Sequence, residues 1–206
     1  MKLDAKQLRT TKSTPGKFSK VKKNPIYIVL DNVLDTYNIG AIFRLADAVA
    51  AEKVILCGQS ETPPHTRIKK ASINTTEWVA WSYAPTAVGA INDLRDQFST
   101  PLEQYVQQAQ YKYSSSESRS IGANREVPGI QIVAIEQSSK SVPYDRFDYS
   151  FPIALVVGHE TNGVSKEVLE ICDGVVELPM FGVNVSLNVM VSLGIVLYRV
   201  AGNLVK

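Results

Sequence analysis

The sequence has few residues of the kinds that build metal centres and disulfide frameworks. Its 206 residues include two cysteines, Cys57 and Cys172, and two histidines, His65 and His159. The cysteines are far apart and form no C-x-x-C pair, so we expect neither a disulfide scaffold nor a structural zinc site, and no metal cofactor. So few cysteines are compatible with a reducing compartment, and we expect a cytoplasmic location.

Several common catalytic motifs are also missing. No G-x-G occurs anywhere, so the dinucleotide-binding fingerprint is absent, as is the paired-glycine loop that binds nucleotide phosphates. Gly163-Val164-Ser165 is followed by Lys166 where a hydrolase nucleophile elbow would need glycine. The chemistry must therefore be sought outside these classes.

What the sequence does contain is enough apolar material for a core and an uneven distribution of charge. Hydrophobic residues make up 45% and charged residues 20%, as in ordinary globular domains. Residues 1–23 hold eight Lys and Arg against one acid, a charge of +7, which leaves −5 on the rest of a chain whose total is +2. We expect a basic tail over 1–24, which indicates a polyanionic partner, followed by one domain over 25–206. A solvated, disordered start is the alternative interpretation of the tail.

One uncharged stretch is long enough to be compared with a membrane span. Residues 178–198 contain no charged side chain, but proline, glycine and asparagine interrupt them and the strongly apolar part is 189–198. That length predicts a core helix preceded by a polar loop, so we expect no membrane association.

The hydrophobic pattern alternates between strands and helices. Short β-branched runs predict strands at 26–30, 54–56, 130–135, 153–157 and 175–178. Apolar residues at helical spacing predict helices at 41–50, 86–98, 166–171 and 187–200. This order is typical of an α/β fold with a mainly parallel sheet flanked by helices. Residues 99–128 are rich in Ser, Gln and Tyr, and we interpret them as an insertion or mobile loop.

The first of three polar clusters surrounds the start of the 41–50 helix. Gly40 and Ala41 are small enough to allow close backbone approach, and Arg44 follows on an otherwise apolar helix. A guanidinium there could hold a phosphate through two hydrogen bonds. The alternative is an ion pair between Arg44 and Asp47.

The second and third clusters follow predicted strands. Residues 158–163 come directly after the 153–157 strand, where ligands bind in open α/β sheets, although an ordinary turn is the alternative. The third cluster covers 178–188, whose irregular backbone could clasp an adenine. Its alternative interpretation is a helix entry with Ser186 as N-cap and Asn188 in the first turn.

In this order the clusters resemble the three motifs of the SpoU (TrmH-like) branch of the SPOUT RNA methyltransferases. The motifs here are Asn38-x-Gly40-Ala41-x-x-Arg44, Val157-Gly158-x-Glu160-x-x-Gly163-Val164, and Leu178-Pro179-Met180-x-Gly182-x-x-x-Ser186-Leu187-Asn188-Val189. The resemblance spans about residues 26–200, and the Ala134–Gln137 segment also matches. His159 stands where the family more often has asparagine.

The resemblance implies a SPOUT-type fold with a C-terminal trefoil knot, a homodimer, and methyl transfer from S-adenosylmethionine to a ribose 2′-hydroxyl of tRNA or rRNA. It implies catalytic roles for Arg44, Asn38, Glu160, Ser186 and Asn188. It implies a cofactor site formed by Val157, Gly158, Glu160, Gly163, Leu178, Met180, Ser186 and Leu187.

The role of Arg44 and the type of activity stay open at this point. A guanidinium remains protonated in proteins and is a poor base, so we interpret Arg44 as an electrostatic clamp on phosphate and hydroxyl. A non-catalytic RNA-binding relative and a methyltransferase acting on a base are the alternative hypotheses.

Overall fold

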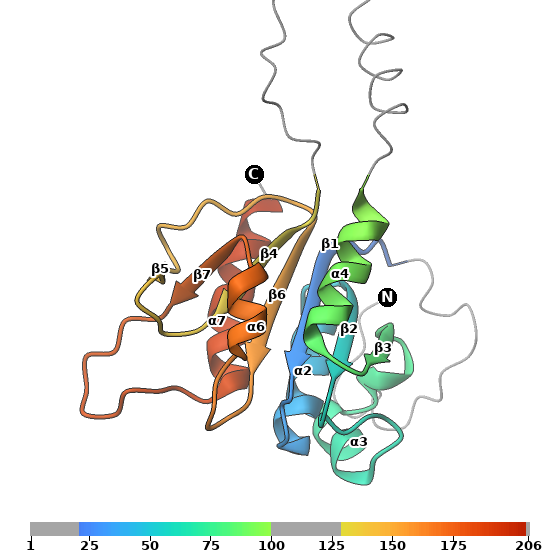
Figure 1. The fold of residues 1–206 in the computed structure, drawn as a ribbon. Helices are drawn as coiled ribbons and strands as arrows, with labels where there is room; N and C mark the ends of the chain where they lie inside the picture. Colours follow the sequence, from blue (N-terminus) through green and yellow to red (C-terminus); the bar gives the residue numbers. More distant parts are fainter. Residues whose placement is uncertain (1–20, 100–128, 205–206) are drawn as a thin grey trace, which may run out of the picture.

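A parallel sheet of seven strands organises the described part of the chain, residues 21–99 and 129–204 of a computed structural model (Figure 1). The strands are β1 (Asn24–Asp31), β2 (Ala51–Cys57), β3 (Trp81–Ala84), β4 (Gln131–Ile135), β5 (Val142–Pro143), β6 (Ile153–Gly158) and β7 (Gly174–Glu177). Their order is β3-β2-β1-β6-β4-β7-β5, and every pairing is parallel. The carboxyl ends of all strands therefore meet at one edge.

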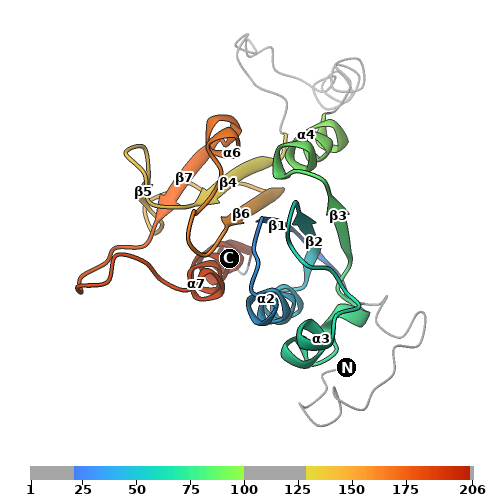
Figure 2. The same ribbon diagram turned by 60° about the horizontal axis from the view of Figure 1, so that its bottom comes forward.

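Helices cover both faces of the sheet. They are α2 (Thr36–Ala48), α3 (Thr66–Ser72), α4 (Ala87–Phe98), α6 (Lys166–Ile171) and α7 (Val189–Ala201), with 3-10 turns η1 (Thr75–Glu77) and η2 (Gly202–Leu204). Figure 2 shows α2, α3 and α7 on one face and α4 and α6 on the other. Each layer buries its own hydrophobic cluster against the central strands, which are apolar on both faces as buried parallel strands must be.

The predicted α/β fold is confirmed, and each of the predicted strands and helices is present. The sequence prediction missed the short elements β3, β5 and α3. Among the described residues no helix is long and apolar enough to cross a membrane, and the 178–198 stretch ends in the 13-residue core helix α7. The knot is implied by the family resemblance and stays a prediction.

Two predicted helix starts were wrong. Helix α2 begins at Thr36 and not at 41, because the Asp35 carboxylate caps it by accepting from the backbone N–H of Tyr37. Helix α7 begins at Val189, and its N-cap is Asn188 where the sequence suggested Ser186. Asn38 and Gly40 consequently lie within a helix, and their side-chain directions are fixed by its geometry.

Gly40 places α3 against α2. A Cβ atom at this position would lie 2.6 Å from Ala71 Cβ and 2.7 Å from the Ile68 carbonyl oxygen, both on α3. The close backbone approach predicted from the small side chain is therefore found, and the approaching backbone is that of α3. Gly40 thus fixes α3 relative to the helix that carries Asn38 and Arg44.

We expect Gly40→Ala to reduce the free energy of unfolding by a net of about 1–2 kcal/mol. Overpacking costs about 1–3 kcal/mol, and contacts under 3.0 Å, one of them with the backbone of α3, place this site at about 2–3 kcal/mol, while Ala gains about 1 kcal/mol within a helix. Urea denaturation would measure the change. Gly202→Ala is the matched control, since nothing lies within 4 Å of a Cβ atom built there. Equal stability of the two variants would contradict a steric role for Gly40.

Candidate active site

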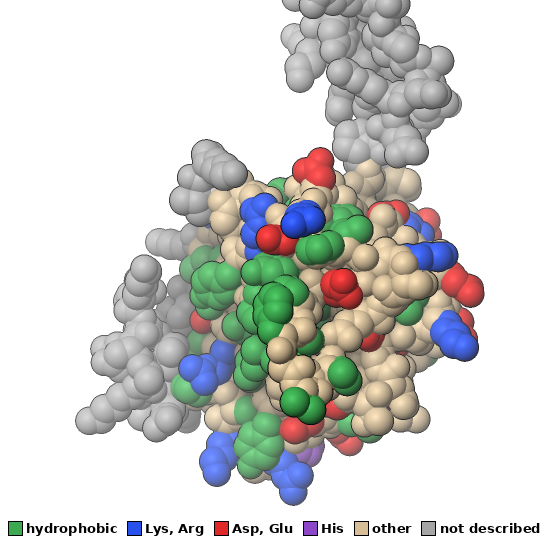
Figure 3. Space-filling view, turned by 90° about the vertical axis from the view of Figure 1, so that its left-hand side faces the viewer, with side chains coloured by type: hydrophobic (Ala, Val, Ile, Leu, Met, Phe, Trp, Pro, Cys, Tyr) green, Lys and Arg blue, Asp and Glu red, His purple; other side chains and the backbone are tan. Residues whose placement is uncertain are grey.

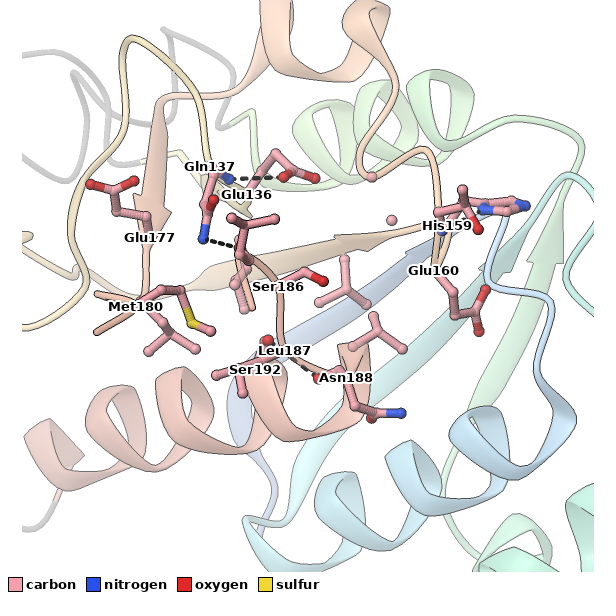
Figure 4. A pocket seen from close by; sticks show the side chains of 18 of the residues that line it. Glu136, Gln137, His159, Glu160, Glu177, Met180, Ser186, Leu187, Asn188 and Ser192 are labelled. Carbon is pink, nitrogen blue, oxygen red and sulfur yellow. Dashed lines mark hydrogen bonds between the residues drawn. The ribbon is translucent and has the colours of Figure 1, made fainter. Parts of the chain in front are cut away.

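A cavity of about 610 Å³ opens at the carboxyl edge of β4, β6 and β7 (Figure 4). Its walls come from segments far apart in the sequence: residues 135–137 after β4, 157–163 after β6, and 176–178 together with 184–189 between β7 and α7. Ligand sites in open parallel sheets are found at this edge, and the volume suits a nucleoside-sized molecule. The second and third predicted clusters both line it.

The lining of the cavity is mixed, with more polar than apolar surface and an acidic component. Three acidic residues line it, Glu136, Glu160 and Glu177, and the described lining includes no Lys or Arg. Apolar surface comes mainly from valine, leucine and methionine side chains, among them Met180 and Leu187. Such a lining favours a ligand with an apolar body and a positive charge, and it disfavours a polyphosphate.

A chain of hydrogen bonds joins the three predicted clusters. The Asn38 amide nitrogen donates to Glu160 Oε1 at 3.1 Å, and Asn38 Oδ1 accepts from Asn188 Nδ2 at 3.0 Å. Asn188 Oδ1 then accepts from the backbone N–H of Met190, which caps α7. Asn38 is 6% exposed, so its amide has little access to water, and these two hydrogen bonds satisfy both its nitrogen and its oxygen within the protein. This relay connects the start of α2, the turn after β6 and the start of α7.

Glu160 anchors the turn after β6 to the segment before α2. Its two carboxylate oxygens accept from the backbone N–H groups of Leu34, at 3.1 Å, and Asp35, at 2.9 Å. Partial burial acts to raise the pKa of Glu160, but these N–H donors and the Asn38 amide outweigh it and hold the pKa below the usual range. The carboxylate is therefore ionised at neutral pH and is poorly suited to carrying a proton.

The turn over 158–163 is too tight for side chains at its two glycines. A Cβ atom on Gly158 would lie 2.2 Å from the Gly163 carbonyl oxygen, and Gly163 has φ of +69°. His159 and Gly163 exchange backbone hydrogen bonds of 3.0 and 2.8 Å across the turn. The His159 ring accepts from the N–H of Thr161 at 2.9 Å, as an asparagine oxygen does in an Asx turn. This explains how histidine can occupy the position where the family more often has asparagine.

Three residues that support the turn and the loop were not predicted as site residues. Asp31 ends β1 and accepts from the Ser165 N–H at 2.8 Å, and Glu136 follows β4 and accepts from the Val164 N–H at 2.9 Å. Gln137 donates from Nε2 to the Val185 carbonyl oxygen at 2.8 Å. Their position in the sequence could have identified them. Each of the three lies at the carboxyl end of a buried strand, in or beside a polar segment.

Arg44 does not line the cavity. It is exposed on the outer side of α2, and it forms no ion pair or hydrogen bond within the described residues. The alternative pairing with Asp47 is absent, because Asp47 Oδ1 accepts from the indole N–H of Trp78 at 2.7 Å. The remaining predicted site residues either line the cavity or, like Asn38, belong to the relay.

Comparison with known proteins identifies the family. The model of the SpoU rRNA Methylase family matches residues 25–116 and 102–198 of this chain. The chain belongs to the SpoU rRNA methylase family.

Two of the comparisons are with proteins of Aquifex aeolicus. A tRNA (guanosine(18)-2'-O)-methyltransferase of Aquifex aeolicus is 32% identical over 181 residues, 86% of this chain and 69% of that protein. The solved A. aeolicus TrmH/SpoU tRNA-modifying enzyme has a TM-score of 0.67 and 27% identity, with 96% of this chain and 81% of that chain covered.

A third comparison concerns the fold alone. The SpoU methyltransferase AviRb of Streptomyces viridochromogenes, solved in complex with AdoMet, has a TM-score of 0.67 and 22% identity, with 90% of this chain and 63% of that chain covered. The chain spans 46% to 69% of the length of curated relatives that it matches.

The two thiols of the SpoU domain are unsuited to nucleophilic catalysis. Burial, with a smaller contribution from Asp31, raises the pKa of Cys57 to about 12. Burial and the neighbouring Asp173 raise the pKa of Cys172 to about 12 as well. Both thiols are protonated at neutral pH. Within the described ranges, no group of three or more His, Cys, Asp or Glu side chains could hold a metal ion.

We expect the stabilising role of Glu160 to depend on pH. Its lowered pKa means that its contribution is present above the unfolded value of about 4.3 and is lost as pH falls through the lower folded value. Glu160→Gln should reduce the free energy of unfolding by about 1 kcal/mol at pH 7, after solvent screening, and by much less near pH 3.

Urea denaturation over this range would measure the difference. Glu170→Gln, on the exposed surface of α6, is the control for general charge effects. If the loss of unfolding free energy in Glu160→Gln stays constant from pH 7 to pH 3, the charge of Glu160 does not contribute to stability.

Proposed function

We propose that this SpoU family member transfers a methyl group from S-adenosylmethionine to a ribose 2′-hydroxyl of tRNA or rRNA, as a homodimer in the cytoplasm. The observation that carries the proposal is the acidic, partly apolar cavity, which the Asn38 relay joins to the first motif. We further propose that residues 25–206 act as one methyltransferase domain preceded by a basic tail. The described residues begin at 21, so most of that tail lies outside them.

The residues of the cavity fit S-adenosylmethionine. The cofactor has an apolar adenine and carries positive charge on its sulfonium and its amino group, whereas nucleotide cofactors carry phosphates. Backbone groups of 178–188 and the side chains of Leu178, Met180 and Leu187 would hold the adenosine part, and Gly158 and Gly163 would shape the opposite wall. Glu136 and Glu177 supply negative charge without an opposing cation among the described lining residues.

When bound, S-adenosylmethionine supplies an electrophilic methyl group, so the protein must orient the hydroxyl and accommodate the loss of its proton. Ser186 lines the cavity and is the candidate for contact with the sugar. The hydrogen bonds among Asn38, Asn188 and Glu160 fix the turn after β6 and the start of α7 relative to α2. Arg44 remains our candidate for the electrostatic clamp on the RNA phosphate, as its free guanidinium permits.

A second copy of the chain would bring Arg44 to the cavity. Helix α7 exposes Val191, Ile195 and Tyr198 at i, i+4 and i+7, a stripe that is 38–57% exposed. The 178–188 loop exposes further apolar side chains, and hydrophobic side chains form a band on the side of the molecule that carries β5 and β7 (Figure 3). Because α2 and α7 pack side by side, a dimer through this face would set the Arg44 of each copy near the other's cavity.

The direct test is methyl transfer. Purified protein with labelled S-adenosylmethionine and unmodified RNA should yield 2′-O-methylated nucleosides, located by nuclease digestion and mass spectrometry. Arg44→Ala and Arg44→Lys should lower kcat by about 10²–10³-fold while cofactor binding persists. Arg146→Ala, another exposed arginine without a side-chain bond among the described residues, should retain activity.

Mixed dimers would test where Arg44 acts. Arg44→Ala and Met180→Arg chains should each be inactive alone, the second because a bulky cation blocks the cavity. A dimer with one chain of each should recover about half of the wild-type rate, since one intact cavity meets one intact Arg44. An inactive mixed dimer would place Arg44 with its own cavity, and methylation of a base would overturn the assignment of the ribose.

The cations of α3 support RNA as the partner. Arg67, Lys69 and Lys70 are exposed within four positions, and α3 itself carries no acid. Helix α3 follows the carboxyl end of β2, so it lies at the same sheet edge as the cavity, beside α2 (Figure 1). RNA backbone contacts from this helix would orient the acceptor strand.

Neutralising this helix should weaken the salt dependence of RNA binding. Lys69→Gln with Lys70→Gln should lower the slope of log K against log[salt] by about 1.4–1.8, which corresponds to two phosphate contacts. Lys53→Gln with Arg146→Gln removes the same charge elsewhere and should leave the slope unchanged. Fluorescence anisotropy with a labelled tRNA would measure both, and equal slopes would exclude α3 from the interface.

A further inference from the structure

The loop between β7 and α7 has few internal supports. Residues 181–188 are all exposed, yet residues 184–188 form one wall of the cavity. Within the loop, the Ser186 N–H donates to Asn184 Oδ1 at 3.3 Å, a weak bond. Among the described residues, one hydrogen bond enters 179–187 from elsewhere in the chain, from Gln137 Nε2 to the Val185 carbonyl oxygen at 2.8 Å.

Gln137 is placed to brace this loop against the opposite wall. It follows Glu136 at the end of β4, and the Glu136 carboxylate accepts from both the Gln137 N–H, at 2.8 Å, and the Val164 N–H, at 2.9 Å. Figure 4 shows the Gln137 side chain reaching across the cavity wall toward the loop. Two neighbouring side chains therefore connect β4 to both of the segments that enclose the cavity.

We propose that Gln137 is a positioning residue that sets cofactor affinity by holding the 178–188 loop in its binding conformation. The inference rests on the proposed function, in which this cavity takes S-adenosylmethionine. Without the bond, the exposed loop would sample more conformations, and the cofactor would have to order it on binding. The loop contacts the bound cofactor both before and during methyl transfer, so the loss should appear in binding and not in kcat.

The magnitude follows from a single neutral hydrogen bond. Such a bond changes an equilibrium about three- to tenfold, and this bond is exposed, so we expect a Kd increase within that range. Gln137 is itself exposed and makes no core contact, so its replacement should leave the melting temperature unchanged.

The matched control is a second glutamine, at the start of the strand that Gln137 follows. Gln131 begins β4 at the opposite edge of the sheet, donates to the Asp148 carbonyl oxygen at 3.1 Å and accepts from the Ser150 N–H at 2.9 Å. Gln131→Met should therefore lower the melting temperature and leave cofactor affinity unchanged. Gln137→Met keeps the length of the side chain, introduces no charge and removes the donor.

The experiment applies three methods to the wild type and both variants, alongside their melting temperatures. Calorimetry gives the Kd of S-adenosylhomocysteine, steady-state kinetics with RNA give KM for S-adenosylmethionine and kcat, and hydrogen exchange without ligand reports the amides of 181–187. Gln137→Met should raise Kd and KM about three- to tenfold, leave kcat within twofold, and speed exchange in the loop.

The outcomes separate the two proposals. A wild type that binds no S-adenosylhomocysteine would overturn the proposed function and the cofactor role of Gln137 with it. A wild type that binds, with a Gln137→Met variant of equal Kd or unchanged loop exchange, would overturn the inference alone. A fall in kcat without a change in KM would also overturn it, because Gln137 would then act on the reaction step.

Discussion

The amide of Asn38 is the contact on which the arrangement of the site depends. It donates to a carboxylate 122 positions away and accepts from an amide 150 positions away, and both partners in turn bind backbone N–H groups. Glu160 satisfies amides before α2, and Asn188 satisfies the first amides of α7. An unpaired buried amide costs more than one bond is worth, so the three segments keep their register as a unit.

The parallel sheet makes this convergence possible, and carboxylates stabilise it. Because neighbouring parallel strands end at the same edge, residues that follow β1, β4 and β6 must meet there, although they are distant in the sequence. The turn after β6 leaves backbone N–H groups directed at this edge. Asp31 and Glu136 accept the N–H groups of Ser165 and Val164, so the ends of the flanking strands complete the bonding of a turn that cannot complete its own.

The sequence predicted the elements of the fold and missed how their ends are capped. Buried strands are continuous apolar runs and amphipathic helices have a periodic pattern, so the centres of both were predictable. The start of α2 was not predictable, because Asp35 and its neighbours are equally typical of a turn. With a helix start at 41, Asn38 lies outside the helix and the direction of its side chain is not defined. The alternative interpretation that made Ser186 the cap of α7 was wrong for the same reason, since Ser186 and Asn188 are both typical N-cap residues. Gln137 could not be assigned a role, since its partner is a backbone oxygen, which no sequence pattern marks.

The distribution of charge in the fold is consistent with two ligands of opposite sign. Among the described residues, the charged side chains that line the cavity are all acidic, while Arg44 and the cations of α3 are exposed outside it. A Lys or Arg in the cavity would attract RNA phosphate but would repel the positively charged sulfonium. One position of low dielectric cannot favour both a phosphate and a sulfonium. The acidic residues lie on β7 and after β4 and β6, and the cations lie on α2 and α3, which resolves the conflict. The clamp role that we propose for Arg44 then requires it to reach a cavity from outside. In the dimer that we propose, a neighbouring copy of the chain would meet that requirement, whereas a rearrangement of α2 would break the Asn38 relay.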